Sequence, residues 1–205
     1  MLALLASVFV ISLSGALMPG PMFATVLARS YKSPWAGAQV SIGHAVIELP
    51  LILLIYFGAA AFFEYTAVQF ILGVAGGGMV IWMGIGMFRA RKAMATGQNT
   101  SRYGTITSGI ILSAGNPFFI LWWATVGALL VLKVTDYGLG GLWALILTHW
   151  SVDLIWLSIV SALVYRTHRL WAPVFQEAVF TGCSLLLVGF GGWFMVSGIQ
   201  AVVAV

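Results

Sequence analysis

Charged side chains are scarce in this chain. Lysine, arginine, aspartate and glutamate together make up 7% of its 205 residues, whereas hydrophobic residues make up 61%. A water-soluble domain carries about 25% charged residues, and a surface this poor in charge would aggregate in water. The shortage excludes an ordinary soluble domain and indicates an integral membrane protein, in agreement with the mean hydropathy of +1.06.

Cysteine is nearly absent as well. Cys183 is the only one, so an intrachain disulfide and a paired-thiol redox mechanism are both excluded. The sequence also lacks zinc-finger spacing, a nucleophile motif, a zinc-protease helix motif and a glycine-rich nucleotide loop. We therefore do not expect an enzyme, a resident metal or a cofactor. The basic residues are scattered in short loops and form no stripe, so we expect no nucleic-acid partner.

Apolar runs of about 20 residues, the length that crosses a bilayer, occur six times. The first run has no basic segment before it, so we interpret it as a retained helix and not as a cleaved signal peptide. The pattern predicts an all-α integral membrane fold in which residues 1–205 form a single transmembrane domain. The six predicted spans lie at about 2–28, 36–58, 67–88, 106–131, 138–164 and 174–200.

The basic residues predict an orientation. Eight of the nine fall in the predicted loops 1–2, 3–4 and 5–6, which six helices place on one side, and the ninth is Lys133. Because loops rich in lysine and arginine stay in the cytoplasm, these three loops should be cytoplasmic and both termini outside. The protein should then be a multi-pass protein of the cell membrane.

The two halves of the chain, about 1–95 and 105–205, resemble each other. His44, followed by an acid at Glu48, recurs in the fifth run as His149 with Asp153. Two glycine-containing dipeptides of the third run recur in the sixth, both 114 residues later: Gly77-Gly78 with Gly191-Gly192, and Gly84-Ile85 with Gly198-Ile199. Each half holds three helices, so the second half should be inverted in the membrane, as in many secondary transporters.

Prolines interrupt two of the predicted spans. Pro19, Gly20 and Pro21 lie inside the first, and Asn116 and Pro117 inside the fourth. Proline removes a backbone donor, so both helices should break there. In lipid, freed backbone groups are tolerated only where they meet protein or a water-filled cavity. The half-helices after the breaks would present amide groups to an anion, which makes these residues candidates for substrate binding. The simpler alternative is a structural kink.

Four ionisable residues fall inside predicted spans. His44 and Glu48 are four apart and share a helix face, as do His149 and Asp153. Each such group near the bilayer centre costs about 2.5–3.5 kcal/mol, so all four should face the interior and pair with one another. A buried carboxylate can exchange a proton for a substrate ammonium, because desolvation disfavours its charged form. A divalent-metal site and purely structural pairs are the alternatives.

Small residues at spacing four, including Gly73 and Gly77, predict close helix packing. This packing would join helices within the chain or between two copies in a homodimer.

At these residues the chain resembles the lysine exporter (LysE) family of amino-acid efflux permeases. The resemblance covers nearly the whole chain and rests on Pro19-Gly20-Pro21, on Gly43-His44 with an acid four further on, and on Asn116-Pro117 before a tryptophan-rich run. Family members typically export amino acids against protons. Many of them have Asp where this chain has Glu48 and Lys where it has Phe118, which leaves the charge of the substrate open.

The resemblance implies a secondary transporter that exports an amino acid or a similar zwitterion by proton antiport. We expect the amides after Pro21 and after Asn116-Pro117 to hold the substrate carboxylate. Glu48 and Asp153 would hold its ammonium or, alternately, a proton, and the two histidines would tune these acids. Its partners would be a small molecule, protons and membrane lipid. A divalent-cation exporter is the second reading, and a structural membrane protein the third.

Overall fold

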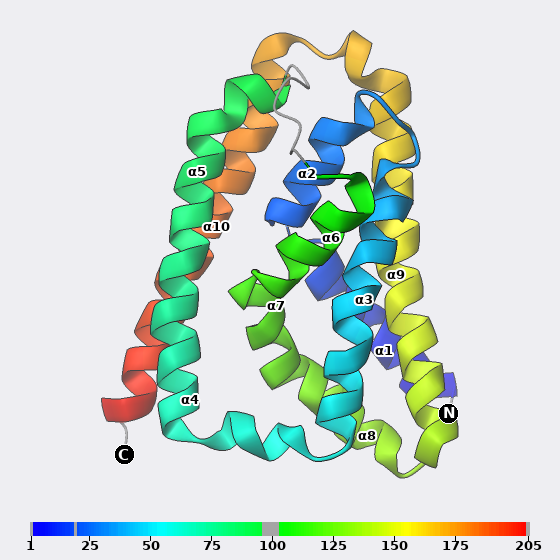
Figure 1. Ribbon diagram of the computed structural model, residues 1–205, viewed down its shortest axis with the longest axis vertical. Helices are drawn as coiled ribbons and strands as arrows, with labels where there is room; N and C mark the ends of the chain where they lie inside the picture. The colour runs from blue at the N-terminus through cyan, green and yellow to red at the C-terminus, as the bar shows by residue number, and fades with distance from the viewer. Residues whose placement is uncertain (1, 19, 96–102, 204–205) are drawn as a thin grey trace.

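The computed structural model describes residues 2–18, 20–95 and 103–203, and every regular element among them is helical (Figure 1). The elements, in chain order, are α1 Leu2–Ala16, α2 Pro21–Ser30, α3 Ala36–Tyr56, η1 Ala59–Glu64, α4 Thr66–Ile71, η2 Leu72–Gly76, α5 Gly77–Ala95, α6 Thr105–Ala114, α7 Pro117–Trp122, η3 Trp123–Gly127, α8 Ala128–Thr135, α9 Gly138–Thr167, η4 His168–Leu170 and α10 Pro173–Val203.

The described helices confirm the predicted membrane fold. Five helical stretches are long and apolar enough to cross a bilayer, and α1 and α2, bent by 77° relative to each other, make a sixth when the pair is taken as one span. The predicted breaks are present: α1 ends at Ala16 and α2 begins at Pro21, while α6 ends at Ala114 and α7 begins at Pro117. Pro19, the first residue of the predicted first break, lies outside the described residues.

Large apolar side chains cover the outside of the helices. Trp82 on α5 is 72% exposed, and Leu54, Leu129 and Leu147 are also exposed on three other helices. In water such a surface would be a strong aggregation hazard, whereas a bilayer solvates it. Together with the helix lengths, this surface makes the chain a multi-pass membrane protein.

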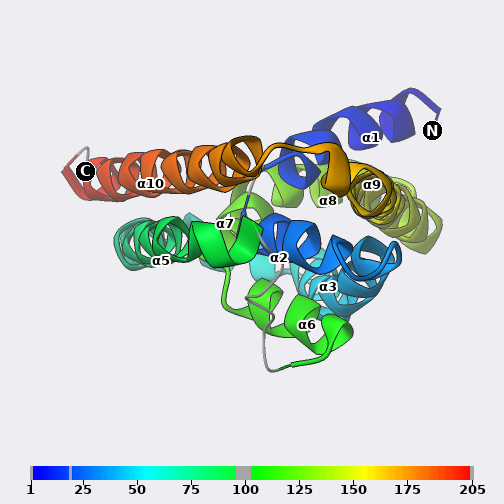
Figure 2. The ribbon, with the colours of Figure 1, turned by 90° about the horizontal axis from the view of Figure 1, so that it is seen from above.

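The helices form two groups. In Figure 1, α5 and α10 run side by side as a pair, and α2, α3, α6 and α9 gather on the other side, with α7 between them. Figure 2, from above, shows the same pair of α5 and α10 apart from the α3, α6 and α9 group. α1 begins and α10 ends at one end of the molecule, and the α2–α3 and α9–α10 connections lie at the other (Figure 1).

Glycines bring α5 and α10 into backbone contact. A Cβ added to Gly73 would lie 2.5 Å from the Cα of Gly198, and one added to Gly191 would lie 2.7 Å from the carbonyl oxygen of Gly77. No other residue fits at such a crossing without displacing a helix. The predicted glycine packing therefore joins two helices of the same chain.

The buried apolar side chains form two separate cores. One, the upper core, includes Val40 and Leu157; the other, the lower core, includes Ile52 and Leu145. On α3 and on α9, the two histidine–acid pairs lie between these residues in the sequence. The ionisable groups are therefore placed halfway along their spans, between two apolar layers.

Two π-helical turns interrupt the spans, one between α4 and α5 and the other directly after α7. They are η2 at Leu72–Gly76 and η3 at Trp123–Gly127. A π-turn inserts one extra residue into a helix, re-aims the side chains after it and is frequent at functional sites. Here η3 begins at Trp123, a residue of the site described below.

Candidate functional site

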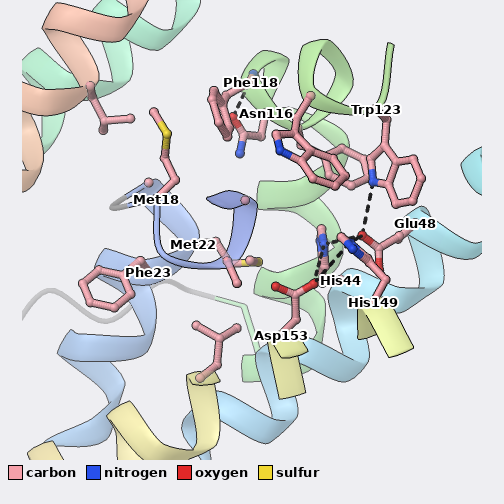
Figure 3. A pocket seen from close by; sticks show the side chains of 17 residues that line it. Met18, Met22, Phe23, His44, Glu48, Asn116, Phe118, Trp123, His149 and Asp153 are labelled. Atoms are coloured by element: carbon pink, nitrogen blue, oxygen red, sulfur yellow. Dashed lines mark hydrogen bonds and ion pairs between the residues drawn. The ribbon is translucent and has the colours of Figure 1, made fainter. Parts of the chain in front are cut away.

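The four ionisable residues predicted to lie in the membrane meet in one buried cluster. His44 and Glu48 come from α3, and His149 and Asp153 come from the neighbouring α9 (Figure 3). Their exposed fractions are 5%, 2%, 4% and 5% in that order. The two pairs, which are 105 residues apart in the sequence, therefore form a single site.

Glu48 is the centre of the cluster. Its Oε1 atom lies 3.1 Å from Nε2 of His44, 3.0 Å from Nε2 of His149 and 3.2 Å from Nε1 of Trp123, which donates its N–H. Three nitrogen groups from three helical segments thus converge on one carboxylate oxygen. Hydrogen bonds to a charged acceptor are stronger than neutral ones, so Glu48 ties α3, α9 and η3 together.

Asp153 is held more loosely. Its Oδ2 atom is 3.7 Å from Nε2 of His149 and 3.9 Å from Nε2 of His44, which are ion-pair distances and too long for hydrogen bonds. Within the described part of the chain, its carboxylate has no hydrogen bond, and it lines a cavity. Asp153 is therefore the acid of the cluster that has room for a further partner.

Two serines, which sequence reasoning missed, fix the far side of each imidazole. Nδ1 of His44 is 2.7 Å from the hydroxyl of Ser113 on α6, and Nδ1 of His149 is 2.7 Å from that of Ser12 on α1. Both serines are buried. Their only signal in the sequence is a hydroxyl inside an apolar span, next to each helix break.

The serines determine which imidazole nitrogen carries a fixed proton. Each hydroxyl is 2.6 Å from the carbonyl oxygen four residues earlier, Val8 for Ser12 and Gly109 for Ser113. A carbonyl only accepts, so the hydroxyl donates to it and accepts from the histidine. Both Nδ1 atoms therefore carry a proton, and only the two Nε2 atoms, which face the acids, remain for proton exchange.

The tryptophans after the second break form one wall of the site. Both Trp122 and Trp123 are buried. The Trp122 ring lies 5.2 Å from the His149 ring at an interplanar angle of 31°, and its Nε1 donates to the hydroxyl of Ser14. The sequence left open whether these rings face lipid or a cavity, and the structure places them at the cavity.

The cluster borders a cavity of about 60 Å³. A water molecule needs about 10–15 Å³ of such space, so the cavity has room for a few waters and is too small for an amino acid. Of the residues predicted at the helix breaks, Gly20 and Asn116 line it, whereas Pro21 and Pro117 do not. The other lining residues include Met18, Met22, Phe23, Phe118, Phe119 and Leu187.

The two helix starts beside the cavity differ. At α7 the side chain of Asn116 caps the helix, because its Oδ1 accepts the N–H of Phe118 at 3.2 Å. At α2 the capping position is Gly20, which has no side chain to accept a hydrogen bond. The first turn of α2 is therefore the better candidate for holding an anion.

Comparison with known protein families identifies one match. A family model, the LysE type translocator, matches residues 13–198. The chain belongs to the LysE type translocator family. Searches of curated proteins and of solved structures found no match.

The family match covers most of the site of this LysE translocator. All four ionisable residues, Ser113 and both tryptophans fall within residues 13–198, and Ser12 lies one residue before the matched region. The predicted family is thereby confirmed, and the match makes the chain a membrane translocator.

Three residues of the translocator's cluster also have the geometry to hold a cation. One ligand atom each from His44, Glu48 and Asp153 lies within 4.8 Å of the others. An imidazole nitrogen with two carboxylate oxygens is a ligand set that several divalent metals accept. The residues therefore fit two cargoes, a proton or a divalent cation.

Proposed function

We propose that this translocator exports an amino acid or a related small zwitterion across the cell membrane in exchange for protons. The observation that carries the proposal is the buried cluster of two acids and two histidines, placed between two apolar cores and lining a cavity, in which Asp153 has no hydrogen bond within the described residues. The family supplies the transport activity. The substrate class and the coupling ion are our inference from the cluster.

The substrate ammonium binds at Asp153. This carboxylate lines the cavity and has no hydrogen bond within the described residues, whereas Glu48 already receives three N–H groups. The substrate carboxylate lies at the first turn of α2, where Gly20 leaves the amides uncapped and the helix dipole is positive. Both charges of the zwitterion are then matched.

The cluster exchanges a proton for the ammonium. With both acids ionised and both imidazoles carrying protons on Nδ1 and Nε2, the four groups have no net charge, which the low-dielectric surroundings favour. An ammonium arriving at Asp153 adds one positive charge. Release of one Nε2 proton from His44 or His149 restores neutrality, and rebinding of that proton expels the ammonium.

The helix breaks provide the movement. The cavity is too small for the substrate, so α2 and α7 must shift relative to α1 and α6 to admit it. We assign the two halves, about 1–95 and 105–205, as inverted repeats of a single domain. The crossed contacts support this assignment, since His44 of the first half bonds Ser113 of the second and His149 bonds Ser12 of the first.

The basic connections lie on the cytoplasmic side. In Figure 1 the α2–α3 and α9–α10 connections share one end of the molecule, opposite the start of α1. Of the eight lysines and arginines among the described residues, seven lie in or beside the connections at this end. The positive-inside rule then places α1's start and α10's end outside.

The test uses the full chain in liposomes with an imposed proton gradient. We expect the gradient to drive amino-acid movement, and Glu48→Gln together with Asp153→Asn to abolish it. A Glu177→Gln variant is the control, because this acid lies near the start of α10 and outside the cluster. Intact substrate-coupled proton movement in the double variant would contradict the proposal.

A divalent-cation exporter is the second candidate, because three ligand atoms of the cluster converge within 4.8 Å. If the chain exports a divalent cation, Mn²⁺ or Zn²⁺ should raise the melting temperature of the protein, and His44→Ala should remove that effect. His168→Ala is the matched control, since His168 bonds only backbone carbonyls. An unchanged melting temperature in the presence of metal rules this candidate out.

A further inference from the structure

A second and larger cavity adjoins the site. Its volume is about 500 Å³, and it lies between α10 on one side and α7 and η3 on the other. We refer to it as the outer cavity, because α7 and α10 diverge toward the end of the molecule where α10 ends (Figure 1). It is lined by Phe63, Gln69, Leu72, Gly73, Phe118, Leu121, Trp122, Ala124, Thr125, Val126, Trp193, Phe194, Ser197, Gly198 and Ala201.

Two aromatic residues separate the outer cavity from the central one. Phe118 and Trp122 line both cavities, so the two spaces share a wall. Trp122 is fixed by its hydrogen bond to Ser14 and by its contact with His149. The wall is therefore rigid on the Trp122 side.

Phe118 is the movable part of this wall. Its ring lies 6.3 Å from the Phe190 ring and 5.7 Å from the Phe194 ring, both on α10, and it packs against the upper and the lower core. These are ring contacts without a side-chain hydrogen bond, and the residue sits in the first turn after the α6–α7 break. Figure 3 shows it beside Asn116 and away from the four ionisable side chains. A small shift of α7 would open the wall at this position.

The lining of both cavities limits the kind of substrate that can pass. Among the described residues that line the outer cavity none is ionisable; their polar side chains include Gln69, Thr125 and Ser197. In the central cavity the charged groups are engaged with one another and with the substrate's own ammonium. A charged substrate side chain would thus find no counter-charge, and desolvating it would be costly. An apolar side chain would instead gain from the aromatic lining.

We infer that the outer cavity is the vestibule through which the substrate leaves, that Phe118 closes it from the central site, and that the substrate carries an apolar side chain. The inference rests on the proposed export function and adds the substrate class and the exit path. The occupant is the departing zwitterion, because the cavity is continuous with the wall of the central site and has hydrogen-bonding groups as well as aromatic ones.

Thiol labelling tests the vestibule. The only cysteine is first replaced (Cys183→Ala), and Ala124→Cys is then introduced in the vestibule lining, with Leu129→Cys as the control on the lipid-facing side of the same span. A membrane-impermeant methanethiosulfonate reagent is added from outside to protein in liposomes. We expect the reagent to modify the cysteine of Ala124→Cys. The cysteine of Leu129→Cys should stay unmodified, although position 129 lies nearer the outer end of the span.

Protection by substrate tests the side-chain class. Leucine should slow the modification of Ala124→Cys several-fold, and lysine at the same concentration should leave its rate unchanged. An unmodified Ala124→Cys would mean that lipid or a second copy fills the cavity and would overturn the inference. Equal protection by lysine would overturn the assignment of an apolar side chain.

The wall is tested by its permeability. In liposomes without substrate, Phe118→Ala should let an imposed pH gradient decay several-fold faster than in wild type, whereas Phe118→Leu should hold it. An unchanged decay in a folded Phe118→Ala protein contradicts a closing role. These outcomes are separable from the proposed function, because proton-coupled export by the wild-type chain is measured without thiols or Phe118 variants.

Discussion

The two histidine–acid pairs of this translocator are alike in sequence and unequal in structure. His44–Glu48 and His149–Asp153 have the same spacing, lie on neighbouring helices and are buried to the same degree. Yet both histidines and Trp123 point their nitrogens at Glu48, whereas Asp153 lies 3.7 Å or more from either histidine. Glu48 accepts three N–H groups through one carboxylate oxygen, and Asp153 accepts none from the described residues.

The two acids therefore differ in what they contact: Glu48 connects helical segments, and Asp153 faces the cavity. Glu48 connects three helical segments by accepting N–H groups from both imidazoles and from Trp123. Asp153 faces the cavity and is free to change its partner. The two pairs are equal in residue spacing, and the side chains around them, above all Trp123 on its π-turn, make them unequal in hydrogen bonding.

Removal of Glu48, the acid that accepts three N–H groups, should have the largest effect on stability. Glu48→Ala leaves three N–H groups, two of them on imidazoles, without their common acceptor, and deleting one partner of a buried ion pair costs about 3–5 kcal/mol. We expect a large drop in the melting temperature of detergent-solubilised protein. Asp153→Ala is the matched comparison and should lower it much less, since no hydrogen bond is lost. Equal drops in melting temperature in the two variants would show that Glu48 and Asp153 contribute alike to stability and would contradict the difference described above.

Loss of the third donor should have an intermediate effect. Trp123→Phe keeps a large ring but removes the N–H that reaches Glu48, and a hydrogen bond to a charged group contributes about 1.5–3 kcal/mol. Trp122→Phe, which removes a hydrogen bond to a neutral serine, serves as the comparison and should cost less. A melting temperature that falls no further in Trp123→Phe than in Trp122→Phe would show that the Trp123 hydrogen bond does not account for the difference between Glu48 and Asp153.

The serines should have the smallest effects, and the two effects should be similar. Ser12→Ala and Ser113→Ala each remove the acceptor of one Nδ1 proton, and a buried hydrogen bond contributes about 0.5–1.5 kcal/mol. Because each serine holds the histidine of the opposite half, the variants should lower stability and slow coupled transport alike. A strong effect from only one of them would show that the asymmetry extends beyond the acids to the histidines.

The sequence predicted the coarse features of this site. The scarcity of charge identified the membrane spans, the prolines marked both helix breaks, and the cost of ionisable groups in lipid indicated that the four would meet. Ser12, Ser113 and the role of Trp123 could not be found this way, because their contacts depend on how α1, α6 and α7 cross α3 and α9. The same holds for the inequality of the two acids, whose sequence surroundings are nearly equivalent.

The most direct test measures proton-driven transport in variants of Asp153 alone. Liposomes containing wild-type protein, Asp153→Asn or Asp153→Glu are given the same pH gradient, and the coupled movement of leucine and protons is recorded. We predict that Asp153→Asn keeps a near-normal melting temperature while losing coupled movement, and that Asp153→Glu retains part of the coupled movement. Full coupling in a folded Asp153→Asn protein would contradict the assignment of Asp153 as the group that binds the substrate ammonium.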